Sequence, residues 1–297
     1  MILILKGEIK INELSLNEYL ESKGIIVMGK YFSHTKDFTR KSCENQISTM
    51  VELHKLLINC KFNNLNRFGS VIGKELESFK VQLKKIERDY NILFEKNSKN
   101  NVEKLFLSEG KRMILQGREA VEYICNNGYL DIIKRSMNRE EICIGRADSG
   151  NLRKVNGNFE IGIIKGISYN LVEEDLYKYI KRTQKKGIKI DEEEFIRFFV
   201  HQSHLSLSSI NYLKGLCTYP KDFFKTWERY KENKKNKSED EFLDLLSKSL
   251  KYESRKFIWC LSYVILKIFW VYNIVMLLNK MHLKTNTYSG LNPTFTW

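Results

Sequence analysis

Apolar residues recur every three or four positions along much of this chain, which is the spacing of one face of an α-helix. The longest such face occupies residues 72–94 and consists of Ile72, Leu76, Phe79, Leu83, Ile86, Tyr90 and Leu93. The same spacing predicts further helices over residues 46–60, 102–126, 129–136, 191–206, 208–217, 221–231 and 241–256, and one that begins at Asp175. The sequence therefore predicts a mostly helical fold.

Residues 142–164 interrupt this helical pattern in the middle of the chain. A short apolar run and a polar loop open the segment, and two further apolar runs, 152–155 and 159–164, close it. Asn156 and Gly157 separate those two runs, and Asn-Gly between apolar segments is a strong signal for a β-hairpin. The expected fold class is therefore α+β, with one small hairpin among many helices.

Residues 257–278 form an almost wholly apolar run that carries one charge, Lys267. The length of this run suits a transmembrane helix, which needs about 20 residues. A lysine near the centre of a membrane span costs about 3 kcal/mol on insertion scales, so an apolar helix packed against the protein or a partner is an equal alternative. More basic residues precede the run than follow it, so a span would place the main body of the chain in the cytoplasm.

The composition narrows the class of protein. The chain has a net charge of +14 and only two prolines, and 42% of its residues are hydrophobic, which favours an ordered globule. The basic balance attracts anionic partners, but the lysines are spread along the sequence, so a dedicated nucleic-acid-binding protein is not expected. The six cysteines include no closely spaced pair of the kind found in zinc knuckles or redox sites, and reduced thiols are expected.

Three histidines are candidates for chemistry. His54 falls on the apolar face of a predicted helix, where a packed core residue is the usual outcome. His201 and His204 are three residues apart and could share a metal ion, but no carboxylate or cysteine is evidently placed to complete the site. Near the N-terminus, Gly24 and Gly29 lack the pattern of a glycine-rich phosphate loop. No metal or nucleotide site is therefore predicted from these residues.

Three segments together resemble a known family. They read MVELH at residues 50–54, DLYKYIK at residues 175–181 and YPKDFFK at residues 219–225. In this order and spacing they resemble the spore coat protein S type of kinase-like family, which belongs with the aminoglycoside and choline phosphotransferases. The resemblance covers residues 25–256, and it implies a protein-kinase-like fold.

The resemblance also divides the chain into four parts. Residues 1–44 correspond to a remnant of the strand-rich small lobe and its hinge, because they are too few for the whole lobe. Residues 45–256 correspond to the helical large lobe. Residues 257–279 hold the apolar helix, and residues 280–297 form a tail. The expected architecture is a mostly helical, protein-kinase-like large lobe with an incomplete small lobe and a C-terminal apolar helix.

The same resemblance locates the positions at which the family performs chemistry. Its catalytic motif, His-Gly-Asp-x-x-x-x-Asn, falls where Ile144 replaces the histidine, Arg146 replaces the aspartate and Asn151 is retained. Arginine cannot accept a proton at any relevant pH. The metal-binding aspartate corresponds to Lys165, which offers no oxygen ligand to Mg²⁺. The resemblance gives Asp175, which is retained, a structural role in bracing the catalytic loop.

These replacements predict a catalytically inactive kinase-like protein, a pseudokinase, that serves as a structural or binding component of the spore coat and uses no cofactor. Its expected partners are other coat proteins or an anionic surface, contacted through the basic run at residues 178–189. A membrane is a further partner if residues 257–278 span one. The expected location is the cytoplasm or the spore coat, with membrane association in that last case.

One alternative function stays open. The chain could be a small-molecule phosphotransferase that binds ATP and Mg²⁺ and uses Asp148, Asn151 and either Glu173 or Glu174 in displaced roles. Asp148 lies two residues after Arg146, so this mechanism would need a different backbone path through the catalytic loop.

Overall fold

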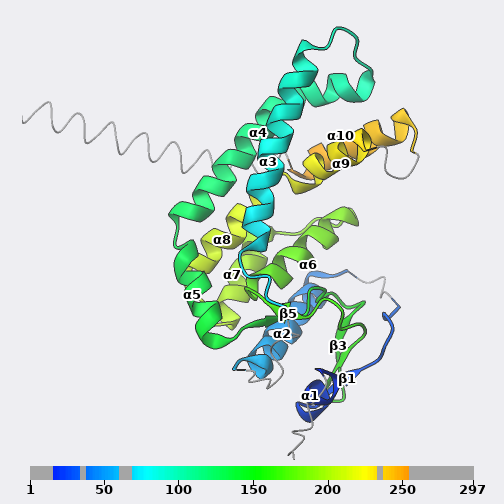
Figure 1. Cartoon of the computed structure of the whole chain (residues 1–297). Helices are drawn as coiled ribbons and strands as arrows, with labels where there is room; N and C mark the ends of the chain where they lie inside the picture. Colours follow the sequence, from blue (N-terminus) through cyan, green and yellow to red (C-terminus); the bar gives the residue numbers. More distant parts are fainter. Residues whose placement is uncertain (1–15, 34–37, 60–68, 233–236, 254–297) are drawn as a thin grey trace, which may run out of the picture.

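The computed structural model describes residues 16–33, 38–59, 69–232 and 237–253, and within these ranges the chain is mostly helical with a few short strands (Figure 1). The helices are α1 (Leu16–Ser22), α2 (Arg40–Leu57), α3 (Lys74–Glu95), α4 (Asn101–Asn126), α5 (Tyr129–Arg139), α6 (Glu173–Lys185), α7 (Glu192–Gln202), α8 (Leu207–Thr218), α9 (Lys221–Lys231) and α10 (Glu239–Glu253). The strands are β1 (Ile25–Val27), β2 (Ile142–Cys143), β3 (Leu152–Val155), β4 (Asn158–Ile161) and β5 (Ser168–Tyr169). The predicted α+β class is confirmed.

The long antiparallel pair of α3 and α4 forms one end of the described structure, and the small strands lie toward the other end (Figure 1). The buried face of α3 is the predicted one and consists of Leu76, Phe79, Leu83, Ile86 and Leu93. Asn100 and Glu103 form a capping box at the start of α4, in which each side chain accepts the backbone N–H of the other residue. Both helices therefore form where the periodicity and the capping residues place them.

Aromatic side chains connect this helix pair to α8 and α9. Tyr219, which ends α8, stacks on Phe79 of α3 with ring centroids 3.8 Å apart. Trp227 of α9 stacks on Phe106 of α4, again with centroids 3.8 Å apart. Phe223 is also fully buried. The aromatic residues predicted at helical spacing in residues 221–231 therefore belong to the core.

The central hairpin is present but is shorter than predicted. Its strands β3 and β4 pair antiparallel, and its turn consists of Asn156 and Gly157, with φ of 49° and 87°. Positive φ at both central residues is the geometry of a type I′ turn, which matches the twist of paired strands. β4 also pairs in parallel with β1, so the sheet order is β1-β4-β3. β4 ends at Ile161, beyond which the amide of Gly162 donates to the backbone carbonyl of Asn151 and the amide of Ile163 donates to its side chain.

Two predicted helix starts are wrong. α2 begins at Arg40, earlier than predicted, because Thr39 and Ser42 form a capping box there. α6 begins at Glu173 and not at Asp175. The carboxylate of Asp175 does not cap its own helix, because it accepts hydrogen bonds from the loop that follows β2.

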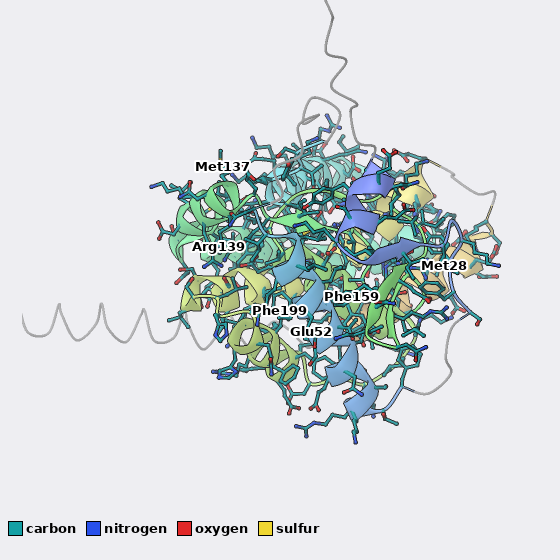
Figure 2. The ribbon with its side chains drawn as sticks, turned by 90° about the horizontal axis from the view of Figure 1, so that it is seen from below. Met28, Glu52, Met137, Arg139, Phe159 and Phe199 are labelled. Atoms are coloured by element: carbon teal, nitrogen blue, oxygen red, sulfur yellow. The ribbon has the colours of Figure 1, made fainter. Side chains whose placement is uncertain are left out.

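Helix α2 lies between the hairpin and α7, as Figure 2 shows from below. Lys154 of β3 pairs with Glu52 of α2, with Nζ 2.6 Å from the carboxylate. The His54 ring meets the Phe199 ring of α7 edge-on, with centroids 6.2 Å apart. α2 is therefore placed to support the loop between β2 and β3.

In the described ranges, no helix has the length and hydrophobicity that crossing a membrane requires. The apolar run at residues 257–278, which the sequence assigns either to a span or to a packed helix, lies outside the described residues. The four-part division of the chain stays a prediction.

Candidate functional site

The loop at residues 144–151 follows β2 and lies against the segment around Gly166. β2 and β5 pair antiparallel, with Cys143 opposite Ser168, and this pairing brings the two segments together. Gly145 has a φ of +75°, and a Cβ atom added there would lie 2.7 Å from the carbonyl oxygen of Gly166. The positions assigned to the catalytic and the metal-binding aspartate therefore belong to adjacent segments.

Asp175 holds the start of this loop from the first turn of α6. Its carboxylate is fully buried and accepts hydrogen bonds from the amides of Ile144 and Gly145, each at 2.9 Å. Nε2 of His54, on α2, lies 3.0 Å from Oδ2 of the same carboxylate. Burial acts to raise the pKa of Asp175, but the interactions with His54, Lys178 and the Ile144 amide outweigh burial and lower the pKa below its usual value. Asp175 is therefore an ionised anchor that fixes the loop between two helices.

Asn151 fixes the other end of the loop. It is fully buried, and its Nδ2 donates to the carbonyl oxygens of Arg146 and Ile163 at 2.9 and 3.2 Å. Its Oδ1 accepts the amide of Ile163 at 2.7 Å. Gln46 of α2 supports the loop from the opposite side by donating to the carbonyl of Ala147 at 2.8 Å. The side-chain amide of Asn151 is therefore engaged within the fold.

Arg146, which the sequence resemblance aligns with a catalytic aspartate, pairs with Asp148. Nε of Arg146 lies 3.2 Å from both carboxylate oxygens of Asp148, and Nη1 of Arg182, on α6, lies 3.2 Å from Oδ2. The amide of Gly150 donates to Oδ1 at 2.9 Å. The Arg146 guanidinium also covers the ring of Tyr31, 4.2 Å from its centroid. Asp148, the fallback candidate for catalysis, is therefore buried and held by two guanidinium groups and an amide.

These residues do not fit a Mg²⁺ site. The segments at residues 144–151 and 162–167 contain a single carboxylate, that of Asp148. Mg²⁺ is bound through carboxylates, phosphates and water in near-octahedral geometry. Lys165, which the resemblance aligns with the metal-binding aspartate, is exposed, and Ile144, which it aligns with the histidine, is buried and apolar. These two segments therefore do not supply the set of oxygen ligands that Mg²⁺ needs.

Glu173, one of the two glutamates that the alternative mechanism invokes, is committed to a different cluster. Arg135 of α5 donates two hydrogen bonds to Glu173, at 2.8 and 2.9 Å, and two to Glu141, at 3.0 and 2.9 Å. Arg135 also donates to the hydroxyl of Ser209 at 2.9 Å. Both carboxylates are almost completely buried. This cluster joins α5, α6 and α8, and it does not include Asp148.

Glu174 is buried on the same helix and has separate partners. It accepts hydrogen bonds from Nδ2 of Asn170 at 2.6 Å and from the hydroxyl of Tyr212 at 3.3 Å, and Nζ of Lys178 lies 3.6 Å away. Burial raises the pKa of Glu174 to about 7. In the described part of the chain, the polar contacts of Glu174 go to these partners and not to Asp148. The structure therefore does not bring together the residues that the alternative mechanism needs.

Three supporting residues were not found from the sequence as parts of this site. His54 is a buried residue, as predicted, but its contact with Asp175 was missed. Gln46 and Arg135 had no sequence signal, because their partners lie up to 106 and 74 positions away along the chain. Long-range polar pairs of this kind leave no periodic pattern in a single sequence.

The remaining candidates for metal and thiol chemistry are two histidines and the cysteines, of which Cys143 directly precedes the loop. Among the described residues, no group of three or more His, Cys, Asp or Glu side chains is arranged to hold a metal ion. His201 and His204 are both exposed at the end of α7. The described cysteines are thiols, of which Cys43, Cys143 and Cys217 are buried and Cys125 is exposed.

Comparison with known proteins identifies the fold. No protein-family model matches the chain, and a search of the curated proteins finds no match. The structure is similar to that of an aminoglycoside phosphotransferase from Alicyclobacillus acidocaldarius subsp. acidocaldarius DSM 446, with a TM-score of 0.62 over 80% of this chain and 68% of that chain. The two sequences are 10% identical, so the similarity shows the fold alone. The chain therefore has a kinase-like phosphotransferase fold, as the sequence resemblance implied.

Proposed function

We propose that this chain is a catalytically inactive kinase-like protein, a pseudokinase, that acts as a structural or binding component. The observation that carries the proposal is the contact between Arg146 and Asp148. A phosphotransferase needs a group that orients or accepts the acceptor's proton at this position. Here the position holds a guanidinium, and the nearest carboxylate in the loop is paired with it.

Two further features support an inactive protein. Lys165 places a positive charge where a phosphotransferase of this fold holds its metal. Asp175 and Asn151 nevertheless keep the loop in a well-defined shape through buried hydrogen bonds. A chain that retains the scaffold and replaces the reacting groups is the pattern we expect of a pseudoenzyme.

We place this role in the spore coat or the cytoplasm, with other coat proteins or an anionic surface as partners and without a cofactor. The support for the coat is the resemblance of residues 50–54, 175–181 and 219–225 to the spore coat protein S type of family. The basic run at residues 178–189 supports an anionic partner. If residues 257–278 span a membrane, the protein is membrane-associated.

Nucleotide binding tests the proposal. We expect ATP with Mg²⁺ to leave the unfolding temperature of the full chain unchanged, measured beside an active phosphotransferase of the same fold as a positive control. A Mg²⁺-dependent stabilisation, worth about 2.7 kcal/mol when ATP is at 100 times Kd, would contradict an inactive protein. Phosphate transfer to a small acceptor that is abolished in Asp148→Asn would establish the alternative function instead.

A further inference from the structure

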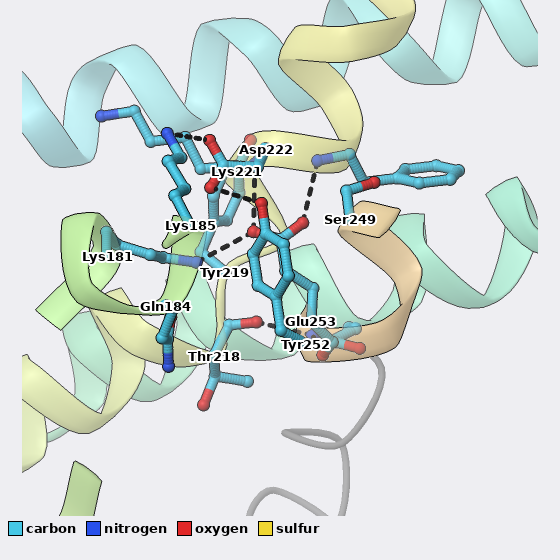
Figure 3. Close-up of polar contacts among 12 residues, drawn as sticks. Lys181, Gln184, Lys185, Thr218, Tyr219, Lys221, Asp222, Ser249, Tyr252 and Glu253 are labelled. Atoms are coloured by element: carbon cyan, nitrogen blue, oxygen red, sulfur yellow. Dashed lines mark hydrogen bonds and ion pairs between the residues drawn. The ribbon is translucent and has the colours of Figure 1, made fainter. Parts of the chain in front are cut away.

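Helix α9 carries a row of basic residues outside the loop at residues 144–151. Lys221, Lys225 and Arg229 are spaced by four positions, so they lie along one face of the helix. Lys185 of α6 approaches the start of this row, and Figure 3 shows it beside Asp222. The row therefore joins the end of α6 to α9 in a single basic surface.

The carboxylates near this surface are already engaged. Glu253 accepts Nζ of Lys181 at 2.9 Å and the amides of Asp222 and Phe223 at 3.0 and 2.8 Å, so it caps the start of α9 (Figure 3). Asp222 accepts Nζ of Lys185 at 2.6 Å and the hydroxyl of Tyr252 at 2.9 Å.

Lys221, the first member of the row, is also paired. Its ammonium forms an ion pair with Glu75 of α3. The carboxylates of Glu253, Asp222 and Glu75 thus each have one lysine partner around the start of α9.

Lys225 and Arg229, the other two members of the row, take no part in these ion pairs. Neither forms an ion pair or a side-chain hydrogen bond with any described residue. Burial, and then the charges of Arg229, Lys221 and Lys185, lower the pKa of Lys225. Asp222 acts in the opposite direction on this pKa, but its carboxylate is paired with Lys185. Lys225 and Arg229 therefore have no ion-pair partner of their own among the described residues.

A buried hydroxyl without a partner lies next to the same surface. Tyr177 of α6 is 1% exposed, and its hydroxyl has no hydrogen-bond partner among the described residues. The ammonium of Lys221 lies 5.7 Å from the Tyr177 ring centroid. Burial, and then the charges of nearby acidic groups such as Glu75, raise the pKa of Tyr177. An unpaired buried donor is costly, so the fold tolerates an unsatisfied group directly beneath the start of the row.

We infer that Lys225 and Arg229, with Lys185 and Lys221 beside them, form a binding site for a compact dianion, the phosphate group of a small phosphomonoester. Side chains four residues apart on a helix have Cβ atoms about 5–6 Å apart, so both can reach one phosphate. Their two charges match those of a phosphomonoester dianion, and arginine binds phosphate with parallel hydrogen bonds. A long polyanion fits less well, because Asp222 and Glu228 flank the row. The inference stands whether or not the chain transfers phosphate.

Inorganic phosphate is the probe that tests this site, titrated into the full chain by calorimetry at low salt and pH 7.5. We expect saturable binding of one phosphate per chain. Each of Lys225→Gln and Arg229→Gln should raise Kd roughly tenfold, which corresponds to about 1.4 kcal/mol for one charge-assisted contact. Because neither residue has a partner in the described fold, both variants should unfold at the wild-type temperature or slightly above it.

The matched control is the pair Lys84→Gln and Arg88→Gln. These residues have the same spacing on an exposed face of α3, but Glu87 and Glu95 lie beside them. We expect this control to bind phosphate as the wild type does. Absence of phosphate binding to the wild type, an equal loss in the control, or tight binding of an aspartate-rich peptide that phosphate does not displace would overturn the inference. Phosphotransfer activity would contradict the proposed function and leave this site intact.

Discussion

His54 and Asp175 form a buried pair that connects α2 to α6 across 121 positions of sequence. Nε2 of His54 lies 3.0 Å from Oδ2 of Asp175, and the two side chains are 5% and 0% exposed. The other ring nitrogen, Nδ1, has no hydrogen-bond partner among the described residues. The carboxylate of Asp175 thus contacts the imidazole and accepts hydrogen bonds from two loop amides at the same time. The shape of the loop therefore depends on this single side chain.

Replacing Asp175 should destabilise the protein strongly. Asp175→Ala leaves the amides of Ile144 and Gly145 and the imidazole of His54 without their acceptor, and we expect a loss of about 3–5 kcal/mol in the free energy of unfolding. Urea denaturation followed by circular dichroism measures this loss. Asp244→Asn, at an exposed position of α10, is the control and should change stability by less than about 0.5 kcal/mol. Similar losses in both variants would show that Asp175 is not an anchor.

Glu174 should make the protein less stable as the pH rises. Burial raises its pKa in the folded state to about 7, from an ordinary value of 4.5, so the folded state binds more protons than the unfolded state between these pH values. Stability therefore falls as the pH rises from about 4.5 to about 7, by about 3 kcal/mol for a shift of this size. Glu174→Gln should remove this slope in urea titrations at several pH values. A wild-type slope that persists in Glu174→Gln would mean that another group titrates.

Asp175 should act in the opposite direction at acid pH. Its pKa is lowered in the folded state, so its contribution is present above the unfolded pKa and is lost as the pH falls through the folded pKa. This contribution can be measured in the Glu174→Gln variant, where Glu174 no longer titrates. As the pH falls into the acid range, Glu174→Gln should lose more stability than the double variant Glu174→Gln with Asp175→Asn.

Gly145 and Gly157 provide a matched pair of substitutions. Both have positive φ, 75° and 87°, so alanine is strained at either position by about 1–2 kcal/mol. A Cβ at position 145 would also lie 2.7 Å from the Gly166 carbonyl oxygen, whereas a Cβ at position 157 would meet nothing within 4 Å. We expect Gly145→Ala to cost about 1–3 kcal/mol more than Gly157→Ala in urea denaturation. Equal costs would show that the loop and the segment of Gly166 are not in tight contact.

The sequence predicted the elements that depend on local patterns. The apolar face of α3, the Asn-Gly turn and the aromatic core of α9 all follow from spacing between neighbouring residues, and all three are present. The predicted helix starts were less accurate. A residue such as Thr39 can be recognised as an N-cap only when its backbone and side-chain geometry are known. The resemblance to a family drew attention to Arg146 and Lys165, which no periodicity would have marked.

The contacts that hold the candidate site together could not be predicted in the same way. Arg135 and Glu173 are 38 positions apart, and His54 and Asp175 are 121 positions apart. Such pairs form only after helices from distant parts of the chain have packed. The residue types alone therefore do not predict which side chains will pair. The resemblance could predict that Arg146 stands in place of a catalytic aspartate. It could not predict that Arg182 and Arg146 would both donate hydrogen bonds to Asp148.

Arg135 and Arg139 test how much the buried polar cluster contributes to the fold. Arg135 is 16% exposed and pairs with Glu141 and Glu173, which are 1% and 0% exposed. Arg139 is 42% exposed and its guanidinium is 3.9 Å from Glu141. Arg135→Met should cost about 3–5 kcal/mol in urea denaturation, because it leaves the buried Glu173 without a cation and Glu141 with only the distant Arg139. Arg139→Met should cost less than about 1 kcal/mol.

A compensated variant separates loss of charge from loss of packing at Arg135. Arg135→Met combined with Glu141→Gln and Glu173→Gln removes all three charges, and we expect it to recover much of the stability lost in Arg135→Met alone. Recovery would show that the cost of the single variant comes from unpaired carboxylates. If the triple variant is as unstable as Arg135→Met, the hydrogen bonds and packing of the guanidinium are what join α5, α6 and α8.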